Sequence, residues 1–186
     1  MNHENIKFEQ KGLLNERIES ERLLLVPISM NYKDEIFKEF SEDITAYMYP
    51  ASATDISETE EFINNSIKGL SEGSNLQLVI LAKDSREFLG NAGLHNIDSK
   101  TPELSVWLKK AAHGKSYGKE AMTVVKKWAD KNLKYDYILY PVADKNIASQ
   151  KIPESLGGKI EREYDEKMMT GKTHHMIEYR IYPDQE

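Results

Sequence analysis

One loop of the chain combines glycine and lysine in a way that suits anion binding. It joins a predicted strand to a predicted helix and reads His113-Gly-Lys-Ser-Tyr-Gly-Lys119. The first turn of a helix leaves backbone N–H groups unpaired and partly positive, and small residues let a phosphate approach them. The loop therefore predicts a phosphate cradle over residues 114–119. Gly114 and Gly118 are also consistent with ordinary turn and packing glycines, since two glycines at this spacing are common.

Several other kinds of site are excluded by residue type. The chain has no cysteine, so disulfides, thiolate zinc sites and cysteine nucleophiles are absent. It shows no obvious Ser-His-Asp spacing for a hydrolytic triad. His174 and His175 are adjacent, so on a strand they point to opposite faces and cannot share one metal ion. We therefore expect no metal site.

The overall composition indicates a single domain with an ordinary core. The 186 residues carry 25 Lys and Arg against 31 Asp and Glu, a net charge of −6, which argues against nonspecific binding to nucleic acid. The longest apolar run, Leu78 to Ala82, is far too short to cross a bilayer, and the first ten residues lack the apolar centre of a signal peptide. We expect a cytoplasmic protein with no membrane and no nucleic-acid partner.

The hydrophobic pattern predicts the elements that position the loop. Residues 1–19 are polar and are predicted to be an extension, followed by one domain at 20–183. Strands are predicted at 23–26, 76–82, 88–94, 103–108, 137–140, 159–163 and 176–182, and helices at 32–40, 57–73, 116–132 and 146–156. This order is typical of a mixed α/β domain built on one sheet.

Two of these elements have internal detail. Ser57 and Glu60 have the spacing of a capping box, and the helix they open is predicted to bury Phe62 and to end at Gly73. The strand at 103–108 alternates. One of its faces carries Leu104, Val106 and Leu108, and the other carries Glu103, Ser105 and Trp107.

A set of segments in a fixed order carries a family resemblance. They are Glu21–Pro27, Gly90–Leu94, Glu103–Leu108, Asn146–Ser149 and Glu154–Gly157, together with Gly171 and Tyr179. Over about residues 20–182 the chain resembles the GNAT family of acetyl-coenzyme A-dependent N-acetyltransferases, most closely the branch that acetylates the N-terminal residue of ribosomal proteins. The family's loop pattern, Gln/Arg-x-x-Gly-x-Gly/Ala, falls on residues 113–118. Here His113 and Ser116 depart from it.

The resemblance implies a fold and a cosubstrate. The fold is a single GNAT-like α/β domain, with a mostly antiparallel twisted sheet splayed between its fourth and fifth strands and flanked by helices. The cosubstrate is acetyl-coenzyme A, with its pyrophosphate on the loop amides and its pantetheine arm along the strand at 106–108. The residues implied to bind it are Val106, Trp107, Leu108, His113, Gly114, Lys115, Ser116, Tyr117, Gly118, Lys119, Asn146 and Ser149. For His113 the alternative is a merely exposed side chain.

The acceptor side is implied less completely. The acceptor would contact Tyr47, Tyr49 and Trp107. For Tyr47 and Tyr49 the alternative is a place in the core. The amine attacks the thioester directly, so a base must take its proton and a backbone N–H near Val106 or Trp107 would stabilise the oxyanion. Glu103 is the candidate base, acting through water, with an exposed strand carboxylate as the alternative.

The leaving thiolate gains from a proton donor, for which Ser149 is the candidate. Its alternative is a helix serine that bonds only to the backbone. Many family members place a tyrosine farther along this helix, where this chain has Pro153; Tyr140 is a less favoured substitute. Asn146 would contact the cofactor, cap the helix, or both.

The leading function is therefore an N-acetyltransferase acting on a primary amine, either a peptide N-terminus or a small molecule, as a monomer or homodimer. The alternatives are a non-catalytic acyl-coenzyme A-binding or protein-interaction domain on the same fold, and a nucleotide-binding module, which the spacing of the loop disfavours.

Overall fold

The computed structural model describes residues 13–184. The strands are β1 (Ile18–Glu19), β2 (Leu23–Pro27), β3 (Leu76–Ala82), β4 (Phe88–His95), β5 (Glu103–Leu108), β6 (Ile138–Ala143), β7 (Lys159–Lys167) and β8 (Thr173–Ile181). The α-helices are α1 (Lys33–Glu39), α2 (Glu42–Thr45), α3 (Ile56–Glu72), α4 (Tyr117–Asn132) and α5 (Ile147–Ser155). Short 3-10 turns are η1 (Leu13–Asn15), η2 (Met30–Tyr32) and η3 (Lys110–Ala112).

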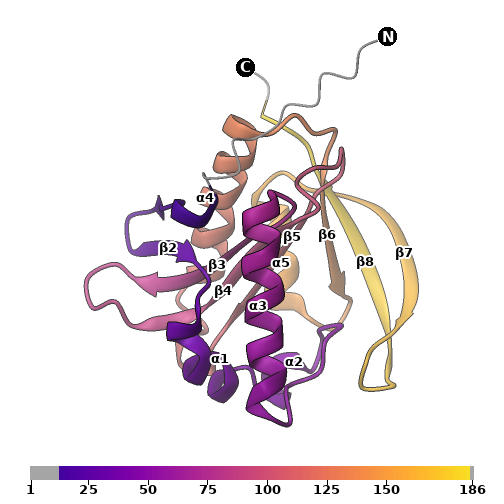
Figure 1. The fold of residues 1–186 in the computed structure, drawn as a ribbon. Helices are drawn as coiled ribbons and strands as arrows, with labels where there is room; N and C mark the ends of the chain where they lie inside the picture. The colour runs from indigo at the N-terminus through magenta and orange to yellow at the C-terminus, as the bar shows by residue number, and fades with distance from the viewer. Residues whose placement is uncertain (1–12, 185–186) are drawn as a thin grey trace.

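All the described strands form one eight-stranded sheet in the order β1-β2-β3-β4-β5-β6-β8-β7 (Figure 1). Neighbouring strands are antiparallel except for β5 and β6, which run parallel. β5 and β6 pair at a single position, Glu103 with Leu139, and then diverge. The predicted mixed α/β sheet, splayed between the fourth and fifth main strands, is therefore confirmed; these strands are β5 and β6 here because β1 precedes them.

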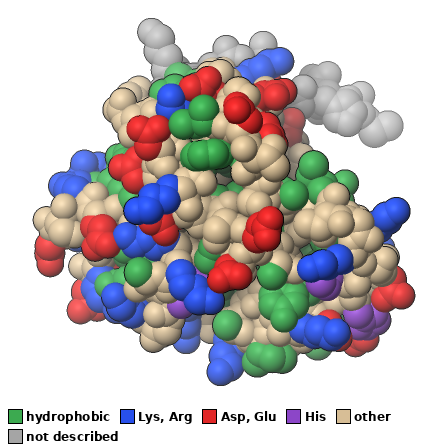
Figure 2. Space-filling model, turned by 90° about the horizontal axis from the view of Figure 1, so that it is seen from below, with side chains coloured by type: hydrophobic (Ala, Val, Ile, Leu, Met, Phe, Trp, Pro, Cys, Tyr) green, Lys and Arg blue, Asp and Glu red, His purple; other side chains and the backbone are tan. Residues whose placement is uncertain are grey.

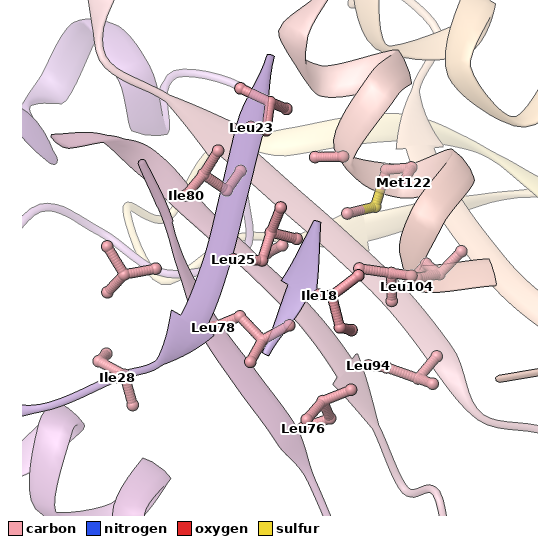
Figure 3. Packing of buried hydrophobic residues seen from close by; sticks show 14 of the residues in the cluster. Ile18, Leu23, Leu25, Ile28, Leu76, Leu78, Ile80, Leu94, Leu104 and Met122 are labelled. Atoms are coloured by element: carbon pink, nitrogen blue, oxygen red, sulfur yellow. The ribbon is translucent and has the colours of Figure 1, made fainter. Parts of the chain in front are cut away.

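The helices cover both faces of the sheet, and the sheet alternation decides which side chains meet them (Figure 1). On one face, Leu25, Leu78 and Leu104 belong to a row of fully buried aliphatic side chains that faces Met122 of α4 (Figure 3). α3 packs against β3 on the opposite face and contributes buried Ile63. Because both faces are covered, β3 and β4 are buried along almost their whole length.

Helix α3 begins earlier than the sequence pattern suggests. Its N-cap is Asp55, whose side chain accepts from the Ser57 backbone N–H at 2.9 Å, while the Glu58 carboxylate accepts from the Asp55 N–H at 3.1 Å. The predicted capping box at Ser57 and Glu60 was therefore wrong, because Asp55 supplies an equally good cap two residues earlier. Phe62 is 41% exposed rather than buried. The predicted end at Gly73 is confirmed, with φ +72°.

The described part of the predicted extension contacts the domain. Leu13 in η1 is buried, and Ile18 lies in β1, which pairs with β2. Residues 1–12 of that extension lie outside the described residues. Among residues 13–184, none of the helices has the length and apolar character that crossing a membrane requires.

Candidate active site

The loop that joins β5 to α4 has the geometry of an anion cradle. Its backbone turns through Gly114 at φ +75° and Ser116 at φ +61°, so that α4 starts at Tyr117. Ser116 is the N-cap, but its side chain makes no capping hydrogen bond. The first amides of α4 are therefore left without a side-chain acceptor at the positive end of the helix dipole.

Gly118 and His113 hold this loop in place. A Cβ on Gly118 would lie 3.3 Å from Ile152 Cδ1 of α5 and 3.7 Å from Leu108 Cδ1, so the absence of a side chain lets α4 pack closely against α5 and β5. His113 Nε2 donates to the Leu108 carbonyl at 2.9 Å. The packing role of Gly118 and the turn role of Gly114 are thus confirmed, and both are compatible with exposed amides in the same loop.

The surroundings of the loop are positively charged and open. Lys115 and Lys119 are both exposed. Beside them lies a hollow of about 260 Å³, lined by Arg22, Ser116, Lys119, Glu120, Thr123 and Val124. Arg22 is held there by Glu120 at 2.6 Å. This region offers cations to an anionic ligand in a chain whose net charge is negative.

The edge of β5 beyond Glu103 is not paired with β6. Val106, Trp107 and Leu108 pair with β4 on their other side. The Trp107 ring packs with Phe40 of the segment after α1 at a centroid distance of 4.9 Å, and with Phe88 of β4 at 5.8 Å. The free edge of β5 can therefore pair with an extended ligand that enters between β5 and β6.

Glu103 starts β5 at the point where the two halves of the sheet still touch. It is half-buried, and it pairs across the sheet with His95. Burial raises the pKa of the Glu103 carboxyl, and the Glu166 and Glu178 carboxylates raise it further. The alternative of a fully exposed strand carboxylate was therefore wrong, and a carboxyl of raised pKa is the kind that accepts a proton well near neutral pH.

A polar cluster next to Glu103 was not predicted. His95 Nε2 lies 2.8 Å from Ser105 Oγ, and a Cβ on Gly93 would lie within 3 Å of His95, Ser105 and Gln77. Burial lowers the pKa of His95, which favours the neutral ring. Strand alternation placed Ser105 on this face, but only strand pairing shows that His95, Glu166 and Glu178 share it.

Ser149 lies in the first turn of α5, a helix that packs against β6. Asn146 caps this helix by accepting from the Ser149 N–H at 3.2 Å, so the predicted cap is confirmed. Ser149 Oγ lies 3.0 Å from the Tyr140 hydroxyl of β6. Because this contact joins the helix to the strand, the reading of Ser149 as a serine that bonds only to its own helix backbone was wrong.

Tyr47 and Tyr49 lie at the surface, between α2 and α3. Their side chains are 38% and 56% exposed, so the alternative that they belong to the core was wrong. The Tyr47 ring meets the edge of His174, and the Tyr49 carbonyl accepts from the Met169 N–H at 3.1 Å. Both tyrosines therefore lie against the β7–β8 hairpin.

The charges elsewhere do not suggest a different site. Within residues 13–184 no group of three metal-ligating side chains is present. On the lower face of the molecule, cationic and anionic side chains alternate with apolar ones, so the described part of this face has no continuous basic surface (Figure 2).

Comparison with known proteins assigns the family. Residues 22–159 match the model of the acetyltransferase (GNAT) domain. The chain belongs to the GNAT acetyltransferase family. No curated protein sequence matches it significantly.

Solved structures agree on the fold at low sequence identity. A ribosomal L7/L12 α-N-protein acetyltransferase, RimL, in complex with coenzyme A has a TM-score of 0.82 and 15% identity, with 92% of this chain and 100% of that one covered. An acetyltransferase from Salmonella typhimurium that modifies the N-terminal serine of L7/L12 has a TM-score of 0.80 and 14% identity, with 91% of this chain and 100% of that one covered. A GNAT-family acetyltransferase from Bacillus anthracis has a TM-score of 0.77 and 19% identity, with 91% of this chain and 100% of that one covered.

Proposed function

We propose that this protein transfers the acetyl group of acetyl-coenzyme A to a primary amine, either a peptide N-terminus or a small-molecule amine. The observation that carries the proposal is the opening between β5 and β6. Glu103, with its raised pKa, lies where β5 and β6 still pair, and Ser149 contacts Tyr140, the residue that follows this pair on β6. The two diverging strands thus carry a candidate base on β5 and a candidate hydrogen-bond donor packed against β6.

The residues present fit acetyl-coenzyme A. The uncapped amides at the start of α4, with Lys115 and Lys119, suit its pyrophosphate, and the free edge of β5 suits its amide-containing arm. When bound, it supplies the activated acetyl group. His113 and Asn146 hold the loop and α5 in place through their hydrogen bonds.

The chain's own groups perform the remaining steps. Glu103 takes the proton that the attacking amine loses, through a water molecule. The backbone N–H of Val106 donates to the developing oxyanion, because the N–H of Lys109 points to β4, and that of Trp107 does the same by strand alternation. Ser149 donates a hydrogen bond to the departing sulfur. Tyr47, Tyr49 and the β7–β8 hairpin border the acceptor's route, on the same side of the sheet as Glu103.

Thiol release from acetyl-coenzyme A with a panel of amines tests this function. The panel should contain peptides with free and blocked N-termini, diamines and amino acids. We expect release that depends on a free amine, with the acetylated product identified by mass spectrometry. Coenzyme A binding without release for any amine would instead support a non-catalytic acyl-coenzyme A-binding domain.

Three further properties of the protein belong to this proposed function. They are a catalytic domain over residues 20–183, a cytoplasmic location and a monomer or homodimer. Sedimentation of the purified protein with and without coenzyme A checks the last of these.

A further inference from the structure

The Tyr140–Ser149 contact has features that packing alone does not require. Tyr140 is 3% exposed, and burial raises the pKa of its hydroxyl to about 12. Its hydroxyl therefore stays protonated at any physiological pH. Ser149 Oγ is the hydrogen-bond partner that the described residues provide for it, at 3.0 Å.

Ser149 differs from Ser66 and Ser155, two other helix serines, in where its hydroxyl goes. Ser66 donates to the Phe62 carbonyl at 2.8 Å, and Ser155 donates to the Ile152 carbonyl at 2.7 Å. Such backbone bonds use the serine proton within the helix. Ser149 has no such bond among the described residues, and its own N–H is taken by the Asn146 cap.

Either hydroxyl can be the donor in the Tyr140–Ser149 contact, and the two directions leave different protons free. A serine hydroxyl has one proton and can accept two hydrogen bonds. If Tyr140 donates to Ser149 Oγ, the serine keeps its proton free for a third group. An accepted hydrogen bond also polarises the serine O–H, which makes it a stronger donor.

We propose that Tyr140 is a positioning residue, which donates to Ser149 Oγ and thereby directs the serine proton to the sulfur of the departing coenzyme A. This inference rests on the proposed function, and it adds a residue from β6 to the site.

The reaction balances without any net transfer of a proton to or from Ser149. The amine nitrogen forms the new C–N bond, and its proton passes to Glu103 through water. The C–S bond breaks, and its electron pair leaves on sulfur as a thiolate. Thiols have a pKa near 8.5, far below that of an aliphatic alcohol, so Ser149 shares its proton in a hydrogen bond and keeps it. The thiol is completed by solvent after release.

The chain contains a matched control for the Tyr140→Phe variant. Tyr179 pairs in register with Tyr140 on β8, is 2% exposed, and donates to Glu154 of the same helix at 3.3 Å. Tyr179→Phe thus removes a buried tyrosine hydroxyl bonded to α5 without affecting Ser149. Both changes keep the ring and its packing.

Steady-state kinetics with one good amine provide the first test. We expect Tyr140→Phe to lower kcat about 3- to 10-fold with an unchanged KM for acetyl-coenzyme A, since one hydrogen bond is lost. Ser149→Ala should lower kcat about 100-fold, and Tyr140→Phe should have no further effect in that background. Tyr179→Phe should leave kcat unchanged. An equal loss from Tyr140→Phe with and without Ser149, or an equal loss in Tyr179→Phe, would overturn the proposal.

A second measurement needs no turnover. Because the chain has no cysteine, the thiol of bound coenzyme A is the only thiol in the complex. Its pKa can be read from the pH dependence of its alkylation. We expect this pKa to be higher in Tyr140→Phe and Ser149→Ala than in the native protein and Tyr179→Phe. This pattern without turnover would refute the acetyltransferase but keep the inference. Turnover together with the same thiol pKa in the native protein and all three variants would refute the role of Tyr140 alone. Failure of coenzyme A to bind would refute both this role and the proposed acetyltransferase function.

Discussion

At the scale of single residues, Glu103 makes the sharpest prediction. Its carboxyl can accept a proton only when ionised, and burial with Glu166 and Glu178 nearby raises its pKa. Activity should therefore fall as the pH decreases through that raised value, at higher pH than for an ordinary glutamate. Glu103→Gln keeps the shape and removes the basicity, so kcat/KM should drop about 100-fold, while coenzyme A affinity stays the same. Superimposable pH profiles of the two proteins would assign the acid limb to another group.

The neighbouring carboxylate offers a matched variant. Glu166→Gln removes a negative charge that disfavours ionisation of Glu103, without touching Glu103 itself. The acid limb of the kcat/KM profile should move to lower pH, because the pKa of Glu103 falls. If the acid limb of the kcat/KM profile does not move, the charge of Glu166 has no effect on the pKa of the group that sets this limb.

At the scale of elements, the entry to α4 contains backbone strain. Ser116 stands where the family has glycine, and it holds φ +61° without a capping bond in return. A left-handed conformation costs a non-glycine residue about 1–2 kcal/mol, of which the greater flexibility of unfolded glycine cancels part. Ser116→Gly should therefore stabilise the fold by up to about 1 kcal/mol in denaturant unfolding and leave coenzyme A binding intact.

The control for this change is a serine at ordinary helical dihedrals. Ser66 is half-buried in the middle of α3, so Ser66→Gly should destabilise by about 0.5–1 kcal/mol. Equal losses from both variants would show that the Ser116 conformation carries no net strain.

The β7–β8 hairpin should make the stability of the protein depend on pH. His175 bonds to Glu163 and Asp165, both at 2.9 Å, and these hydrogen bonds raise its pKa to about 8. A histidine whose folded pKa exceeds its unfolded value of about 6.5 stabilises fully below 6.5 and loses this contribution as the pH rises through 8. The difference in Tm between the native protein and His175→Gln should therefore be larger at pH 6 than at pH 9. An equal difference at both values would exclude the charged pairing.

At the scale of the whole molecule, the two ends of the sheet differ. β1 is two residues long, whereas β7 is a nine-residue exposed edge. Antiparallel pairing of two β7 strands about Glu163 would place Lys159 opposite Lys167 and the two glutamates opposite each other. Like charges in facing positions disfavour that pairing, so this edge resists joining sheets between copies.

The sequence predicted local features well and long-range ones poorly. Strand alternation gave the two faces of β5, and the loop pattern located the start of α4, because both depend on near neighbours along the chain. The partners of Glu103 could not be predicted in this way. His95 reaches it through strand pairing, and Glu166 and Glu178 lie in the distant β7–β8 hairpin. Likewise, the hydroxyl partner of Ser149 depends on how α5 packs against β6.

Because β5 and β6 share one paired position, a ligand that fills their opening should stabilise the molecule as a whole. At 100 times its Kd, coenzyme A should add about 2.7 kcal/mol and raise Tm by roughly 5–10 °C. ATP, which lacks the amide-containing arm that would pair with β5, should shift Tm far less. Lys115→Gln with Lys119→Gln should reduce the coenzyme A shift at fixed concentration, whereas Lys127→Gln with Lys131→Gln, which removes the same charge from the later turns of α4, should not. Equal shifts from ATP and coenzyme A would show that the loop recognises phosphates alone, and the opening between the strands would then have no part in binding.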